Sequence, residues 1–243
     1  MKHQAMSAAL FAVLAGAASP HVLAATLNNG DVLTIATGQI VTDSNGNPIN
    51  ISSGSYYGVD TNGDNRIGGT EKTVLSQGTT GLVIGVTSVA GASHSGCPTA
   101  SDTNEVTAPD CFFGNTGSWH FTVAPTGSTE GGMNMSGWNW PWNGVPSIPL
   151  GSGAWQPLNC ADLGCSGYTF TEGIGRLQWD GVYGHAYTLD FASTVPDGDP
   201  SGFGGVHFYT HLEGTVVPEP AAVWMFGAGL LVLLGMARAR RSR

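Results

Sequence analysis

Cationic side chains are scarce in this sequence. Of the eight lysines and arginines, only Arg66, Lys72 and Arg176 lie between residues 25 and 216. The same range contains all but one of the 17 acidic residues. Three cations against sixteen acids leave this part with a formal charge of −13. Proteins that bind nucleic acid neutralise its phosphates with lysine and arginine, so the composition argues against a nucleic-acid partner. The excess of carboxylate is typical of a well-solvated exported protein, or of one that takes up divalent cations.

The motifs of the common catalytic sites are also missing. The sequence contains no G-x-S-x-G, no phosphate-binding loop, no G-x-G-x-x-G and no H-E-x-x-H. Its many carboxylates could supply the acid pair of a glycosidase, but no spacing singles out two of them. We therefore predict a protein that is not an enzyme, and keep an extracellular hydrolase as the third interpretation.

Amphipathic helical patterns are nearly absent between residues 25 and 216, and turn dipeptides recur instead. The turns are Asn45-Gly46, Asn62-Gly63, Asn143-Gly144, Asp180-Gly181 and Asp197-Gly198; the strand-like runs are residues 31–41, 82–89, 119–123, 187–191 and 206–212. Short alternating runs between such turns predict a mostly β fold, an antiparallel β-sandwich or a barrel-like domain over residues 25–216. One short helix is predicted at residues 70–77, stopped by Gly78.

The first residues have the pattern of a secretory signal peptide. Lys2 and His3 begin a short basic region, residues 5–18 are small and apolar, and Val22-Leu23-Ala24 places modest side chains before a cleavage point. We expect residues 1–24 to be removed and the rest to be exported through the inner membrane.

The last residues have three parts in a fixed order. These are Val217-Pro218-Glu219-Pro220, an uncharged apolar run at residues 221–237, and a basic end with Arg238, Arg240, Arg241 and Arg243. As a helix the apolar run would span ~25 Å, the short end of what crosses a bilayer. Proline cannot extend that helix backwards, and the arginines favour a cytoplasmic end, so a single transmembrane helix at 221–237 is predicted.

This tail at residues 217–243 resembles the PEP-CTERM sorting signal of Gram-negative bacteria. The resemblance implies recognition by an exosortase, a membrane cysteine transpeptidase that cuts near Pro218–Pro220. It also implies a transient inner-membrane anchor, followed by release to the cell surface or to an exopolysaccharide matrix. The alternative is an ordinary membrane anchor that is never cut. The tail directs where the protein goes, and it leaves the activity of residues 25–216, the body of the protein, open.

Four cysteines lie in the body, namely Cys97, Cys111, Cys160 and Cys165. An even count in an exported chain favours two disulfides. Of the three connectivities we favour the local pairs, Cys97–Cys111 and Cys160–Cys165, because each pair closes a loop rich in Gly, Pro or Asp. A zinc site formed by His94, Cys97, Cys111 and His120 is the weaker alternative, because its spacing matches no common zinc pattern.

Residues 60–71 resemble the calcium loop of EF-hand and dockerin proteins. The proposed oxygen ligands are the side chains of Asp60, Asn62, Asp64 and Glu71 and the carbonyl of Arg66. They occupy loop positions 1, 3, 5, 12 and 7, from which ligands converge on one calcium ion. Asn65 replaces the usual glycine, although asparagine tolerates left-handed backbone well. No helix precedes the loop, and a plain Asn-Gly turn is the alternative.

Two further groups of residues suggest chemistry. Trp138, Trp140 and Trp142 would point the same way in an extended chain, where they could stack on sugar rings or fill the core, and we favour the core. His207 and His211 would sit ~13 Å apart on a strand, too far for one metal ion, so we expect exposed strand histidines. The sequence thus predicts a cell-surface or exopolysaccharide-matrix protein, with a carbohydrate-binding module as the alternative.

Overall fold

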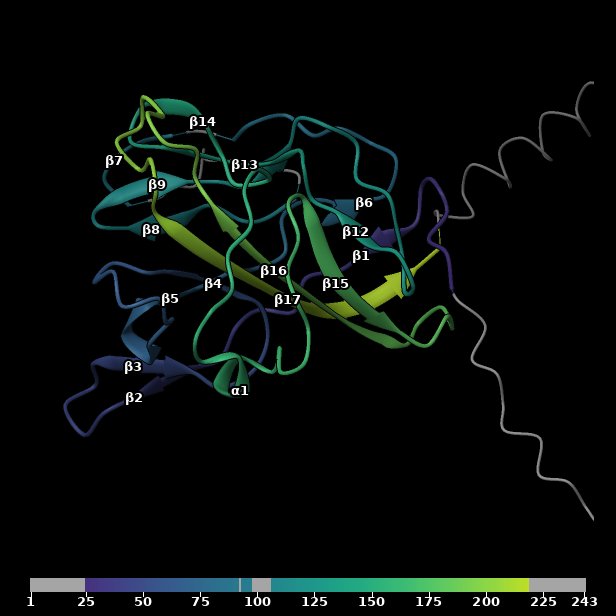
Figure 1. Ribbon diagram of the computed structural model, residues 1–243, viewed down its shortest axis with the longest axis horizontal. Helices are drawn as coiled ribbons and strands as arrows, with labels where there is room; N and C mark the ends of the chain where they lie inside the picture. The colour runs from purple at the N-terminus through teal and green to yellow at the C-terminus, as the bar shows by residue number, and fades with distance from the viewer. Residues whose placement is uncertain (1–24, 92, 98–105, 219–243) are drawn as a thin grey trace, which may run out of the picture.

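The structure is a computed structural model that describes residues 25–91, 93–97 and 106–218. The described chain is mostly β, and its named strands pair in antiparallel sheets (Figure 1). The predicted mostly-β class is confirmed. Helical structure in the described ranges is confined to the single turn η1 (Gly69–Glu71) and the short helix α1 (Cys160–Leu163).

The larger sheet is organised around its longest strand. Its strands are β11 (Gly127–Ser128), β12 (Gly132–Asn134), β15 (Ile174–Trp179), β16 (Ala186–Thr194), β17 (His207–Val217), β1 (Val32–Leu33), β6 (Leu82–Val83), β4 (Tyr56–Val59) and β5 (Lys72–Val74). One edge of β17 pairs with β16 from Thr194↔His207 to Ala186↔Thr215. Its other edge pairs first with β4 and then with β1. Both edges of β17 are therefore covered along most of its length.

A second sheet faces the first. It contains β10 (His120–Phe121), β13 (Trp138–Trp142), β9 (Asn115–Gly117), β7 (His94–Ser95), β14 (Val145–Pro149) and β8 (Asp110–Phe112). A separate hairpin is formed by β2 (Ile40–Thr42) and β3 (Pro48–Ile51). The turn between β13 and β14 uses Asn143 and Gly144, with φ of 48° and 80°. Left-handed backbone at both positions suits the twist of a hairpin, so this predicted turn is confirmed.

The main core fills the space between the two sheets. The indoles of Trp119 and Trp140 from the second sheet region meet Tyr57 of the larger sheet, and Trp140 also meets Phe208. Trp138 stacks on Trp119 in the same core. Along β17 the alternation predicted from the sequence holds, because Phe208, Leu212 and Val216 all face this core.

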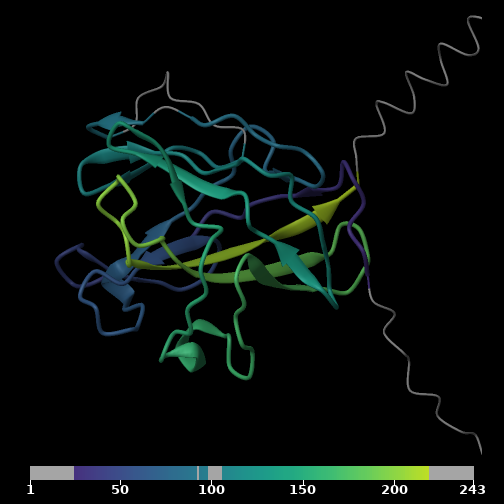
Figure 2. The same ribbon diagram turned by 45° about the horizontal axis from the view of Figure 1, so that its top comes forward.

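The other face of the larger sheet carries a second, smaller core. Tyr56, Tyr209 and Ala192 pack there against Trp155 and Phe170. The covering segment, residues 155–170, contains α1 and lies on the far side of the sheet from the second sheet (Figure 2). The larger sheet is therefore the middle of three layers, and its histidine-bearing face is partly covered rather than exposed as predicted.

Several predicted elements differ from the structure in kind or in extent. The runs 31–41 and 119–123 form strands only at Val32–Leu33, from Ile40 onward, and at His120–Phe121. In place of the helix predicted at 70–77, the chain forms the turn η1 and the strand β5, because a helix of this length is marginal by itself and β5 can pair with β4. The apolar run at 82–89 forms a strand only at Leu82–Val83. Beyond it the chain turns at Gly85, whose φ is 76°.

The first and last described segments lie at the same end of the molecule (Figure 1). Val32 pairs with Val217, and Ala25 lies against Gly181 in the loop that precedes β16. The predicted signal peptide at 1–24, transmembrane helix at 221–237 and basic end lie outside the described residues. Within the described ranges, no helix is long and apolar enough to span a bilayer.

Candidate functional site

The loop 60–71 begins where β4 ends. The Asp60 N–H donates to the His207 carbonyl at 3.0 Å, so the loop starts beside the first residue of β17. Asn65 adopts a φ of 62°, the left-handed conformation expected at the sixth position of the loop. The turn geometry that the sequence predicts for residues 60–65 is therefore present.

The two end acids of the loop bind its own backbone. Asp60 is 6% exposed and accepts hydrogen bonds from the N–H groups of Gly63, Asp64 and Asn65. Glu71 accepts from the Thr61 N–H and hydroxyl and from the Gly68 N–H. A carboxylate offers about four acceptor positions, so each of these acids keeps about one for another partner.

These contacts decide how well the loop fits calcium. The Asn62 and Asp64 side chains are likewise turned to the backbone, where they accept from the N–H groups of Asp64 and Arg66. Among the described residues, no three His, Cys, Asp or Glu side chains form a group placed to hold a metal ion. The backbone turn thus fits a calcium loop, whereas binding would require Glu71 to exchange hydrogen bonds for the ion.

A distant segment holds the loop in place. Asn159 donates from its side chain to the Ile67 carbonyl at 3.0 Å and accepts from the Ile67 N–H at 3.2 Å. The Leu158 N–H and the Trp155 indole both donate to Asn65. Sequence reasoning missed this clamp, because nothing in the residues 155–159 points to a partner about 90 positions earlier.

Two hollows flank the first residues of β17. One, of about 450 Å³, is lined by residues 60–63, Asn65 and residues 204–207. The other, of about 310 Å³, is lined by residues 59–61, Phe112, Phe113, residues 202–203 and Val206. They share Asp60, Thr61 and Val206, so they adjoin at one end of the molecule.

The tryptophan row does not form the glycan surface that was the alternative to core packing. Trp138 and Trp140 have no exposed area, and the Trp119 ring stacks against both, at centroid distances of 5.1 and 5.5 Å. Only Trp142 is partly exposed, and it packs on Phe203. The three rings share one face, as predicted, but that face is the core. The hypothesis of sugar stacking on Trp138 and Trp140 is wrong, and the favoured interpretation, core packing, is confirmed.

His207 and His211 occupy separate environments on β17. His207 stacks on Trp155 at 4.8 Å and its Nδ1 bonds to the Thr194 hydroxyl. His211 lies between Asp190 on Nδ1, at 2.6 Å, and Glu213 on Nε2, at 3.0 Å. Burial disfavours the charged imidazole, but the hydrogen bonds and charges of the two carboxylates outweigh it and raise the pKa of His211.

A buried acid lies beside the indole stack. Asp110 is 7% exposed and accepts a hydrogen bond of 2.8 Å from the Tyr57 hydroxyl. Burial raises its pKa to about 7, although Tyr57 and the nearby Trp140 indole favour the charged form. Neither Trp140 Nε1 nor Asp110 Oδ1 reaches hydrogen-bond geometry with a described partner. An unpaired carboxylate oxygen inside a core favours the protonated acid.

Both predicted disulfides are confirmed. Cys97 pairs with Cys111, and Cys160 pairs with Cys165, with Cα–Cα distances of 5.0 and 4.7 Å. The first ties the segment ending at Cys97 to β8, and the second closes the turn of α1 in the outer layer. No described cysteine remains free.

The sorting motif lies at the edge of the described chain. Val217 is the last residue of β17 and Pro218 follows it, whereas Glu219, Pro220 and the basic arginines lie outside the described residues. No protein-family model, no curated protein and no solved structure matches the chain.

Proposed function

We propose that the chain is an exported protein whose tail is processed by an exosortase and whose body, without catalytic activity, is displayed at the cell surface or in an exopolysaccharide matrix. The support for the address is the order of motif, apolar run and arginines in residues 217–243. We also propose that the two facing sheets make the body a β-sandwich with an added outer layer.

The observation that carries this function is the placement of β17. The strand has 11 residues and ends at Val217, where the sorting motif begins. Its first residue, His207, lines one of the two hollows. At about 3.3 Å per residue the strand separates the hollow from the motif by roughly 33 Å. A body held by its tail would therefore present the hollows on the side away from the attachment.

Processing is tested by intact mass of the protein in the surface fraction of a host that contains an exosortase. The expected protein lacks residues 1–24 and most of residues 219–243. Glu219→Ala should keep the tail and stay in the inner-membrane fraction, because it removes the only charge of the motif. Glu172→Ala, an exposed acid outside the motif, should be processed normally. A wild-type surface protein that retains residues 221–243 would contradict the proposal.

Calcium binding by the loop 60–71 is a second, separate part of the proposal. The left-handed Asn65 and the nearly buried Asp60 support it. In the calcium-bound form, Asp60, Asn62, Asp64, the Arg66 carbonyl and Glu71 would supply oxygens, which are the ligands calcium takes. Because Asn159 already clamps the loop, calcium has little left to order, and we expect a structural site rather than a switch. The site should be weak, because Glu71 must give up backbone hydrogen bonds to bind the ion.

Thermal unfolding of the full chain in millimolar calcium and in chelator tests this site. At one hundred times the dissociation constant the ion would add about 2.7 kcal/mol of stability. Glu71→Gln should remove most of that gain, and Glu172→Gln, an exposed acid elsewhere, should not. Equal melting temperatures of the wild-type protein in calcium and in chelator would leave the loop as a plain turn.

A further inference from the structure

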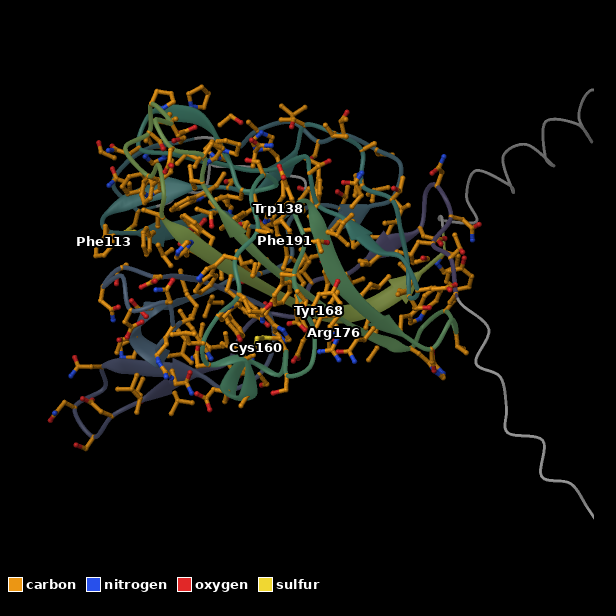
Figure 3. All side chains as sticks on the ribbon, in the orientation of Figure 1. Phe113, Trp138, Cys160, Tyr168, Arg176 and Phe191 are labelled. Carbon is orange, nitrogen blue, oxygen red and sulfur yellow. A yellow bond between two sulfur atoms is a disulfide. The ribbon has the colours of Figure 1, made fainter. Side chains whose placement is uncertain are left out.

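Phe113 stands in a conformation that its side chain does not favour. It forms, with Gly114, the two-residue turn between β8 and β9, and its φ is 46°. Asparagine, aspartate or glycine is the usual residue at such a position, because a bulky side chain is strained in left-handed backbone. The Phe113 side chain is also 74% exposed (Figure 3). Neither the turn nor the core explains a phenylalanine here.

The Phe113 ring borders an aromatic hollow. It meets Phe112 edge to face at 4.5 Å, and both line the cavity of about 310 Å³ together with Phe203. Phe203 is itself held by Trp142, with ring centroids 5.1 Å apart. The cavity therefore has aromatic walls, of which Phe203 is held by packing, and its volume lies at the lower end of small-ligand sites, which run from about 300 to 1,000 Å³.

The adjoining hollow offers hydrogen-bond donors. Asn62 and Asn65 use their side-chain oxygens to accept from the Asp64 N–H and the Trp155 indole. Among the described residues, this leaves both side-chain amide nitrogens without a partner. His207 uses Nδ1 toward Thr194, which leaves Nε2 for a ligand. All three residues line the hollow of about 450 Å³.

The charges around the two hollows favour a neutral ligand. Arg66, Lys72 and Arg176 are the only cations of the body, and none of them lines either hollow, so an anion would meet no counter-charge. Asp60 is the only acid in the two linings, and it already accepts three backbone N–H groups, so beyond the calcium ion proposed for the loop it leaves little charge for a cationic ligand. Aromatic walls beside amide donors match a ligand with C–H faces and hydroxyl edges.

We propose that the two hollows bind a neutral sugar unit of a polysaccharide. One face of the sugar ring packs against Phe113 and Phe203, its hydroxyl oxygens accept from the Asn62 and Asn65 amides, and one hydroxyl pairs with His207 Nε2. The weakly positive C–H groups of a pyranose suit the negative face of an aromatic ring. This goes beyond the proposed address, because it assigns the body a ligand and holds whether or not the tail is cut.

Affinity electrophoresis of the full chain in native gels tests this site. The gels contain dextran, mannan or arabinogalactan as neutral polymers, or alginate or chitosan as charged ones. At least one neutral polymer should retard the wild-type protein. Phe113→Asn should weaken that binding about tenfold or more, equivalent to ~1.4 kcal/mol. Its melting temperature should be unchanged or higher, because asparagine accepts the left-handed turn. A purely structural role would lower the melting temperature and leave binding intact.

Two further variants complete the test. Val89→Asn removes another exposed apolar side chain, 73% exposed and outside both hollows, and should bind like the wild-type protein. Asn62→Asp keeps the oxygen that accepts from Asp64 but removes the amide donors, so binding should weaken about threefold to tenfold. Retardation by no neutral polymer, retardation only by the charged ones, or wild-type binding by Phe113→Asn would overturn the proposal. Unaltered binding by Asn62→Asp would overturn its polar half.

Discussion

The buried carboxyl of Asp110 should make the protein less stable as the pH rises toward neutrality. Its ordinary pKa of 3.8 is raised to about 7, first by burial, so the folded protein keeps a proton that the unfolded chain loses. Between these two values the unfolded state binds fewer protons, so the free energy of unfolding falls with increasing pH. A difference of about three units at 1.36 kcal/mol each is worth about 4 kcal/mol. Below pH 4 and above pH 7 this contribution is constant.

Asp110→Asn isolates the effect. Asparagine mimics the protonated acid and can still accept from the Tyr57 hydroxyl, so the variant should match the wild-type stability near pH 4.5 and exceed it near pH 8. Urea unfolding of the full chain at four pH values between 4.5 and 8.5 measures both slopes. His211, whose raised pKa also favours acidic conditions, is present in both proteins and cancels in the comparison.

Asp197→Asn serves as the control, because Asp197 is exposed and should leave the wild-type slope unchanged. The reasoning is refuted if Asp110→Asn keeps the wild-type dependence on pH. It is also refuted if that variant is strongly destabilised at pH 4.5, where the acid and the amide should be equivalent.

Three other substitutions test the packing of the layers. Trp138→Ala should cost about 3–5 kcal/mol in the free energy of unfolding, measured in urea, because it empties one side of the indole stack; a loss below 1 kcal/mol would contradict its burial. Asn159→Ala removes two hydrogen bonds to the loop and should cost about 1–3 kcal/mol. It should also speed tryptic cleavage after Arg66, followed by mass spectrometry, and an unchanged cleavage rate would show that the clamp is not needed. His211→Gln leaves Asp190 and Glu213 without their shared cation and should cost about 3–5 kcal/mol near pH 5, with a smaller loss at pH 8; an equal loss at both pH values would argue against a charged His211.

The local features of the fold could be predicted because their causes are local. Asn143-Gly144 forms its hairpin turn since these residues tolerate left-handed backbone wherever they stand. The alternation of apolar and polar residues over 206–212 predicts a strand with two different faces, because successive side chains of a strand point to opposite sides. The two disulfides followed from short separations between cysteines, 14 and 5 residues.

The candidate site depended on contacts that no sequence pattern records. Phe113-Gly114 could have been recognised as a turn from its glycine, but the exposure of the ring and the hollow beside it could not. The partnership of Asn159 with Ile67 spans 92 positions of the chain. The hydrogen-bond partner of such a side chain cannot be predicted from the sequence, because it depends on how two layers of the fold pack together.

The sequence by itself determined the mostly β class and the surplus of negative charge, and it favoured the local cysteine pairs, because backbone preference, composition and short loops need no tertiary contact. Only the tertiary structure decided which face of each strand is covered. It buried Trp138 and Trp140 between two sheets and placed a third layer over the histidine face of β17. It left Phe113 in solvent beside Phe203. Burial of apolar surface is favourable whichever segment provides the cover. The segment that covers a given face is therefore set by the whole tertiary arrangement and not by any single stretch of residues.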